Sequence, residues 1–140
     1  MKTNNELLDT WLPLTQILSN INDELEQALQ QHYDLSLKEF FVLKFISQSE
    51  KKELRIQQLQ EMVGLSQSAV SRLVVRMEAE KCGALQKHIC KDDRRGIYTG
   101  ITEIGEKKLQ RALETVNEVL ETSLQKNGVK LELQTLIQML

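Results

Sequence analysis

Five polar side chains between residues 67 and 76 have the chemistry and the spacing to contact nucleic acid. A guanidinium group can pair with guanine or with a phosphate, a glutamine amide can pair with adenine, and a hydroxyl can bind a phosphate oxygen. Their intervals of three and four residues place them together on one face of a helix. Arg72 is the best candidate for a base contact. The five residues are Gln67, Ser68, Ser71, Arg72 and Arg76.

A second group of cations follows in the segment KDDRRG, residues 91–96. The flanking segments, residues 84–90 and 97–101, are short and β-compatible, and the final glycine suits a turn. We therefore predict a β-hairpin with a basic tip. A projecting loop with two guanidinium groups can enter a narrow minor groove, where the negative potential is enhanced. The cations at or near the tip are Lys91, Arg94 and Arg95.

The preceding residues predict the elements that hold the polar face in place. Residues 57–63 form a short helix in this interpretation, with Met62 among the residues that face inward. Gly64 can take the positive φ of a tight turn between helices, and Ser66 can cap the next helix. That helix is expected over residues 67–81. Its buried stripe comprises Val70, Leu73, Val74 and Met77.

An apolar helix over residues 36–47 is expected to form the centre of the core. Ser36 and Glu39 make a capping box at its start, and three of its apolar residues are aromatic. A small-molecule pocket lined by the same rings is the alternative. Residues 54–56 are expected to add an edge strand beside the hairpin. The candidate ligand-binding residues are His32, Tyr33 and Phe41.

The first predicted helix, about residues 6–31, carries apolar residues at alternating steps of three and four. This pattern is a heptad seam, and its width and length favour contact with a second subunit. Pro13 should kink this helix or mark its start, with Thr10 as a possible N-cap. A long helix begins at Thr102, and residues 129–140 form a terminal helix that is too short to be stable unpacked. The predicted dimerisation residues of the first helix are Leu7, Trp11, Leu14 and Leu18.

The charge distribution fits a phosphate-facing unit on an acidic scaffold. The 140-residue chain has a net charge of −2, but residues 51–111 hold 13 Lys and Arg against 8 Asp and Glu. A basic middle with acidic ends is typical of such a protein. No apolar run approaches the ~18 residues of a membrane span, and the N-terminus is too polar for a signal peptide. We therefore expect a cytoplasmic protein without a membrane partner.

Other chemistry is less well supported by the residues. Cys82 and Cys90 do not form a disulfide framework, and together with His88 they fit no zinc-binding spacing, so no metal is expected. A redox-responsive pair is the stronger alternative, since Lys87 or His88 beside a thiol would favour the reactive thiolate. No catalytic triad order, phosphate-binding glycine loop or paired carboxylates stand out, so we expect neither an enzyme nor a cofactor.

Residues 66–85, SQSAVSRLVVRMEAEKCGAL, and residues 93–109, DRRGIYTGITEIGEKKL, resemble the MarR family of bacterial transcription regulators. The second segment matches the family's wing signature: Asp, any residue, Arg, then a strand ending in Leu-Thr and a Gly three residues on. Here these residues are Asp93, Arg95, Ile101 with Thr102, and Gly105; Ile101 replaces the usual Leu. The similarity in layout covers nearly the whole chain, whereas the specific motif covers about fifty residues.

The resemblance implies a mostly α fold with a small β-hairpin wing, namely a winged helix-turn-helix with long N- and C-terminal dimerisation helices. Residues 35–102 would be the DNA-binding region of a single domain, and residues 1–34 and 103–140 the dimerisation helices. Arg95 would reach the minor groove, while Ser68, Ser71 and Arg72 would contact the major groove. The terminal helix would add Leu133, Leu136 and Ile137 to the subunit interface.

We therefore predict a homodimeric regulator that represses transcription from a double-stranded operator with imperfect two-fold symmetry. The resemblance also implies a small-molecule effector or an oxidant that releases DNA, although the oxidant-sensing members use a Cys near the N-terminus that this chain lacks. A winged-helix module that binds protein is the other alternative. Such a module would need apolar anchors on its exposed helix face, where only Val75 is apolar.

Overall fold

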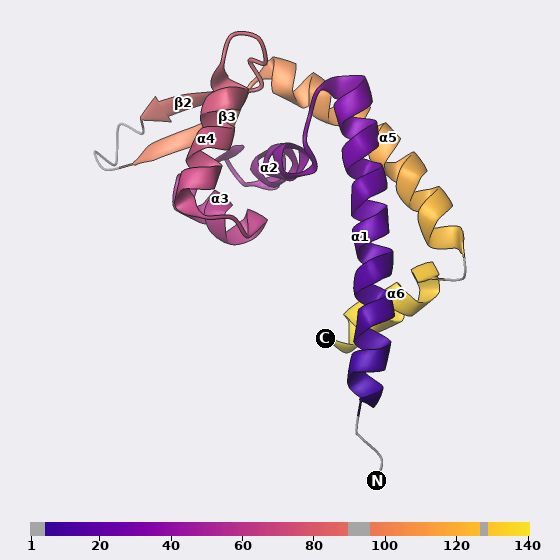
Figure 1. Ribbon diagram of the computed structural model, residues 1–140. Helices are drawn as coiled ribbons and strands as arrows, with labels where there is room; N and C mark the ends of the chain where they lie inside the picture. Colours follow the sequence, from indigo (N-terminus) through magenta and orange to yellow (C-terminus); the bar gives the residue numbers. More distant parts are fainter. Residues whose placement is uncertain (1–4, 90–95, 127–128) are drawn as a thin grey trace.

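The computed structural model describes residues 5–89, 96–126 and 129–140. Figure 1 shows the order and arrangement of the elements in these ranges. The helices are α1 (Glu6–Tyr33), α2 (Leu37–Gln48), α3 (Ile56–Val63), α4 (Gln67–Glu78), α5 (Glu103–Gln125) and α6 (Val129–Met139). The strands are β1 (Glu53–Leu54), β2 (Leu85–Ile89) and β3 (Ile97–Ile101).

The elements from α2 to β3 form a lobe, and α1 extends away from it as a long helix (Figure 1). α5 packs along α1, and α6 follows α5. The core lies where α2 meets the C-terminal half of α1, the two short helices α3 and α4, and the start of α5. Its fully buried side chains include Leu29, Leu43, Ile46, Leu59 and Met77.

A small antiparallel sheet has the strand order β1-β3-β2. β2 and β3 pair from Leu85 opposite Ile101 to Ile89 opposite Ile97, and β1 pairs with the other edge of β3. The β2–β3 hairpin projects from the lobe beside α4 (Figure 1). The predicted fold class, mostly helical with a small β-hairpin wing, is therefore confirmed.

Local side chains start several of these helices. Ser36 and Glu39 form the predicted capping box of α2: Ser36 N donates to Glu39 Oε1 at 2.8 Å, and Glu39 N donates to Ser36 Oγ at 3.0 Å. Ser66 caps α4 by accepting a hydrogen bond from Ala69 N at 3.2 Å. Between α3 and α4, Gly64 has a φ of 74°, which a residue with a side chain rarely adopts. These predictions are confirmed.

The prediction that Thr10 caps the first helix is wrong. α1 begins at Glu6 and continues to Tyr33, so Pro13 lies in its interior, and the Thr10 hydroxyl donates to Glu6 O at 3.0 Å within the helix. Pro13 removes one backbone donor close to the helix start. The residues around it are solvent-exposed, so water can bind the carbonyl that loses its partner.

The predicted end of α4 is also wrong, because the helix stops at Glu78 and not at residue 81. Ala79 leaves the helical conformation with a ψ of 147°. Gly83, with a φ of 62°, then donates from its backbone N to Ala79 O at 2.7 Å, and this turn directs the chain into β2. The spacing of apolar residues does not predict backbone hydrogen bonds of this kind, so it did not indicate this helix end.

Two smaller predictions around α3 need correction. The edge strand is Glu53–Leu54, one residue earlier than expected, and Ile56 already begins α3. Arg55 lies between them as the N-cap, with its backbone N donating to the Gln58 side chain at 2.9 Å. Met62 was expected to face inward but is 48% exposed, because the eight-residue helix buries Leu59 and Val63 instead.

The heptad seam of α1 divides into a buried half and an exposed half. Leu25 is 5% exposed within the core, whereas Leu7 is 86% exposed. α6 buries none of its residues. No helix of the described residues is long and apolar enough to cross a membrane.

Candidate nucleic-acid interface

α4 has a buried face and an outward face. Val70, Val74 and Met77 are fully buried against the core, which fixes the helix on the lobe. The outward face presents the predicted polar side chains: Gln67, Ser68 and Arg72 are exposed and Ser71 is half-buried. Arg72 forms no ion pair or hydrogen bond with the described side chains, so its guanidinium group remains available to a ligand.

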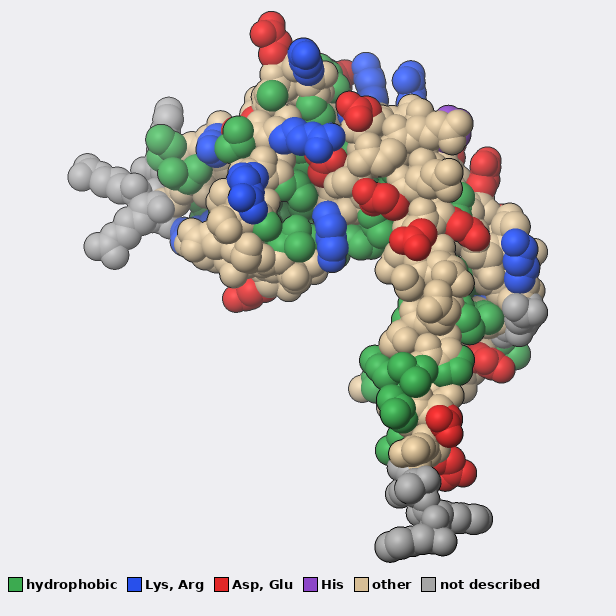
Figure 2. Space-filling model, viewed as in Figure 1, with side chains coloured by type: hydrophobic (Ala, Val, Ile, Leu, Met, Phe, Trp, Pro, Cys, Tyr) green, Lys and Arg blue, Asp and Glu red, His purple; other side chains and the backbone are tan. Residues whose placement is uncertain are grey.

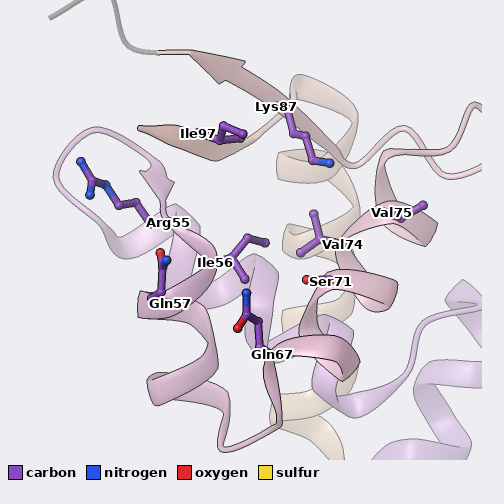
Figure 3. A pocket seen from close by; sticks show the side chains of 9 residues that line it. All are labelled: Arg55, Ile56, Gln57, Gln67, Ser71, Val74, Val75, Lys87 and Ile97. Atoms are coloured by element: carbon purple, nitrogen blue, oxygen red, sulfur yellow. The ribbon is translucent and has the colours of Figure 1, made fainter. Parts of the chain in front are cut away.

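A hollow of about 290 Å³ lies between α4, the start of α3 and the wing. In Figure 3, Gln67 and Ser71 reach it from α4, Gln57 from α3 and Lys87 from β2, with Val75 at its rim. Both hydrogen-bonding and apolar groups therefore line one concave surface. The lining residues are Arg55, Ile56, Gln57, Gln67, Ser71, Val74, Val75, Lys87 and Ile97.

Arg55 and Gln57 are site residues that the sequence did not reveal. Arg55 precedes α3, and its Nη2 donates to the Tyr98 hydroxyl at 3.0 Å while its guanidinium lies 5.1 Å from the centre of the Tyr98 ring. This stacked contact fixes the start of α3 against the wing strand β3. The pairing of β1 with β3 brings the two residues together, and no local pattern predicts a contact between segments so far apart.

A second contact ties the wing to β1. The Glu53 carboxylate of β1 and the His88 Nε2 of β2 are in contact across the central strand β3. Gly100 lies between them, opposite Glu53 and opposite Gln86. A Cβ at this position would lie 3.0 Å from His88 Cε1, so the missing side chain makes room for the His88 ring. His88 thus has a structural partner beneath the wing.

Arg76, predicted to contact DNA, also has a partner within the chain. Its Nε lies 3.5 Å from Glu39 Oε2; Arg76 keeps 58% of its side chain exposed, whereas the Glu39 side chain is only 4% exposed. Glu39 also belongs to the capping box of α2. The pair therefore joins α4 to the start of α2.

The first turn of α2 makes further contacts of this kind. Lys38 Nζ donates to Val63 O at 2.9 Å, at the end of α3. Leu37 N donates to Glu26 Oε2 of α1 at 2.5 Å. Together with the Arg76–Glu39 pair, these bonds connect one turn, residues 36–39, to three other helices. We call these residues the hub turn.

The wing joins α5 through a close contact between glycine and backbone. Thr102 Oγ1 donates to Gly83 O at 2.6 Å and accepts from Gly105 N at 3.0 Å, which caps α5. A Cβ on Gly105 would lie 2.2 Å from Ala84 O, closer than any side chain permits. The Thr-x-x-Gly part of the wing signature therefore has a physical basis.

The predicted tip of the wing, with Lys91, Arg94 and Arg95, lies outside the described residues, as does Cys90. On the face drawn in Figure 2, Lys and Arg side chains gather over the lobe. Cys82 is half-buried, and Lys108 Nζ is 3.9 Å from its sulfur. Within the described ranges, no group of three His, Cys, Asp or Glu side chains is arranged so that it could bind a metal ion.

The residues predicted to bind a ligand lie near the junction of α1, α2 and α5. The Tyr33 hydroxyl donates to Arg111 O at 2.9 Å and is 2.5 Å from Thr115 Oγ1, so it holds α1 against α5. Phe41 packs at the edge of the core against Phe40 and Phe45. His32 is exposed on the last turn of α1.

The predicted dimerisation residues form two apolar surfaces. Green side chains cover the lower part of α1 in Figure 2, where Leu7, Leu8, Trp11 and Leu14 line a shallow apolar groove. On α6, Leu136 and Ile137 are exposed and Leu133 is half-buried. These side chains remain in contact with water within one chain.

This fold, with a polar recognition helix beside a β-hairpin wing, defines the MarR-type winged-helix transcriptional regulators. The family model for the transcriptional regulator SarA/Rot matches residues 24–112, so the chain belongs to that family of transcriptional regulators. A sequence comparison with curated proteins finds no significant match.

Solved structures have the same fold over nearly the whole chain. Sco3205, a MarR family regulator from Streptomyces coelicolor in complex with DNA, covers 99% of this chain and 88% of its own, at 19% identity and a TM-score of 0.84. A MarR family regulator from Silicibacter pomeroyi covers 99% and 89%, at 28% identity and 0.76. NadR in complex with 4-hydroxyphenylacetate covers 91% and 89%, at 19% identity and 0.68.

Proposed function

We propose that the protein is a sequence-specific repressor that binds double-stranded DNA as a homodimer on a pseudo-palindromic operator. The observation that carries this proposal is the division of α4 between a fully buried apolar face and an outward face of amide, hydroxyl and guanidinium groups. The complex of Sco3205 with DNA supports the same partner for this chain. We place the protein in the cytoplasm, because a DNA-binding regulator must reach the DNA that it controls.

In this proposal α4 enters the major groove. Arg72 pairs with a guanine edge, and Gln67 pairs with an adenine edge. Ser68 and Ser71 bind phosphates or base edges near the start of the helix, where the exposed backbone N–H groups also favour an anion. Arg76 can add a phosphate contact through its exposed face while it remains paired with Glu39.

The wing is proposed to contact the adjacent minor groove. Arg95 enters the groove, and Lys91 and Arg94 bind the phosphates beside it. Lys87 lies at the root of the wing and also faces α4, where its Nζ is 3.8 Å from Glu78. The wing and α4 therefore share one basic surface that spans two grooves.

A second copy of the chain is the proposed cover for the apolar surfaces of α1 and α6. Residues 1–34 and 103–140 then serve as dimerisation helices and residues 35–102 as the DNA-binding region. A two-fold axis would place the two α4 helices ~34 Å apart, the distance of one turn of DNA. The interface comprises Leu7, Trp11, Leu14, Leu18, Leu133, Leu136 and Ile137.

A small-molecule effector that releases DNA completes the proposal. NadR is bound to 4-hydroxyphenylacetate, which supports an aromatic acid as the ligand class. Tyr33, Phe41 and His32 lie where the lobe joins α1 and α5, so a ligand there can alter the angle between them. Thermal-shift assays with 4-hydroxyphenylacetate and with its non-aromatic analogues test this part.

A gel-shift titration against DNA upstream of the protein's own gene tests the central proposal. We expect a shifted complex whose affinity falls steeply as salt rises, because bound cations displace counterions from the phosphates. Arg95→Ala should weaken binding and reduce the salt slope by about one unit. A protein that shifts no duplex at low salt, or whose affinity is independent of salt, would not be a DNA-binding regulator of this kind.

A further inference from the structure

Val75 is an exposed apolar residue in the middle of the outward face of α4. Its side chain is 58% exposed, whereas the adjacent Val74 is fully buried. Ser71 precedes it by four residues and Arg72 by three, so both are its neighbours on the helix surface. α4 is described throughout, and Val75 is the only large apolar side chain on its outward face.

The surroundings of Val75 indicate what kind of group can cover it. It lies at the rim of the hollow, on α4 one helical turn beyond Ser71, and both residues line the hollow (Figure 3). A protein partner would need several apolar anchors, but on the outward face of α4 one valine among polar and cationic side chains supplies a single small contact. The other exposed apolar residue that lines the hollow, Ile97, belongs to the wing strand β3. A suitable partner therefore presents one methyl-sized apolar group among hydrogen-bonding groups and negative charges.

The major groove of DNA contains such a group. Thymine carries a C5-methyl group on its major-groove edge, and this is the apolar feature of the base edges there. We propose that Val75 packs against the methyl group of one thymine in each operator half-site, next to the base pair that Arg72 contacts. This inference rests on the proposed function and assigns a specificity role that the polar residues cannot fill.

Replacement of thymine by deoxyuridine tests the contact, because it removes only the methyl group. The probe is a duplex selected by the wild-type protein from a random-sequence pool, with each thymine replaced singly by deoxyuridine. We expect one position per half-site at which the change weakens binding about fourfold, the factor that corresponds to burial of one methyl group. Other thymines should change affinity little.

Val75→Ala provides the second arm of a double-mutant cycle. The variant should bind the thymine duplex about fourfold more weakly, yet bind the thymine and deoxyuridine duplexes equally well at the sensitive position. Arg72→Ala is the matched control: it should lower affinity overall while it preserves the ratio between the two duplexes. Thermal unfolding of both variants should match the wild type, since both side chains are exposed.

The outcomes separate this inference from the proposed function. If no duplex is retained in the selection, both are overturned. If a duplex is retained but deoxyuridine has no effect at any position, or if Val75→Ala keeps the full sensitivity, the inference alone is overturned. If the selected half-sites contain no position that is always an A·T pair, the inference alone is likewise overturned.

Discussion

Arg72 and Arg76 lie one helical turn apart on α4 and have different surroundings. Arg72 projects from the outward face without a partner among the described side chains. Its guanidinium group can therefore donate two parallel hydrogen bonds to one base. Arg76 lies against the buried carboxylate of Glu39. We therefore propose that the same residue type serves base recognition at position 72 and helix placement at position 76.

We expect Arg72→Ala to cost ~1–3 kcal/mol at one base pair of each half-site and to relax the preference there. Arg72→Lys keeps the charge but cannot form the bidentate pair. Compared with Arg72→Ala, it should regain salt-dependent affinity but not the preference for one base pair. Binding to a panel of single-base operator variants measures both effects. A uniform loss across the panel would show that Arg72 contacts a phosphate.

For Arg76 we expect a combined effect on stability and binding. Arg76→Ala leaves the Glu39 carboxylate buried without its cation, which should lower the free energy of unfolding by about 1 kcal/mol, a modest value because Arg76 is itself exposed. Glu39→Gln keeps the capping bond to Ser36 but removes the charge.

Chemical denaturation of the two single variants and the double variant gives the coupling energy. If the effects of the two substitutions simply add, the ion pair does not hold α4 in place. If Arg76→Ala loses only salt-dependent DNA affinity and keeps its stability, Arg76 contacts a phosphate and does not hold α4 in place.

Among the elements, the joint between wing and α5 sets the position of the hairpin relative to α4. Gly105→Ala places a Cβ against Ala84 O, where β2 begins, so strand and helix must separate. We expect a loss of ~1–3 kcal/mol in unfolding free energy. We also expect a loss of DNA affinity, because the displaced wing would not reach the minor groove while α4 lies in the major groove.

The adjacent Ile104→Ala is the control for this prediction, since Ile104 is exposed at the same end of α5. Its unfolding midpoint and affinity should stay close to those of the wild type. A Gly105→Ala protein with wild-type stability would indicate that α5 tolerates a shift at this joint, and the proposed role of Gly105 would be wrong.

The starts of α2 and α4 were predictable from the sequence because a cap is a local feature. Ser36 with Glu39, and Ser66, reveal themselves within four residues of the helix that they begin. The end of α4 and the contacts of Glu53 and Arg55 were not predictable in this way. The end of α4 depends on the backbone hydrogen bond from Gly83 to Ala79. The contacts of Glu53 and Arg55 depend on the pairing of β1 with β3, which brings together residues that are distant along the chain.

At the scale of the molecule, α1 and α6 leave apolar side chains exposed, and we propose that a second copy of the chain covers them. We expect Trp11→Glu to shift the protein toward a monomer, because a carboxylate cannot be buried in an apolar interface without a counter-charge. Sedimentation velocity measures the change, and binding to a two-half-site operator should fall with it.

Gln16→Glu adds the same charge to an exposed position of the same helix and should leave the assembly intact. If both variants sediment as the wild type does, the groove lined by Leu7 and Trp11 is not the subunit interface. The heptad seam predicted the location of this surface. It did not predict how far the seam also serves the core of one chain, because only folding determines where α5 and α2 cover it.

The hub turn connects α1 to both short helices of the lobe. Bonds from residues 36–39 reach the end of α3, the last turn of α4 and the side of α1. If α1 tilts, these bonds would pass the movement to α3 and α4 through one short segment, so the two helices would move together with α1. In the proposed dimer, a small change in the tilt of α1 would therefore change the separation of the two α4 helices with no rearrangement inside either lobe.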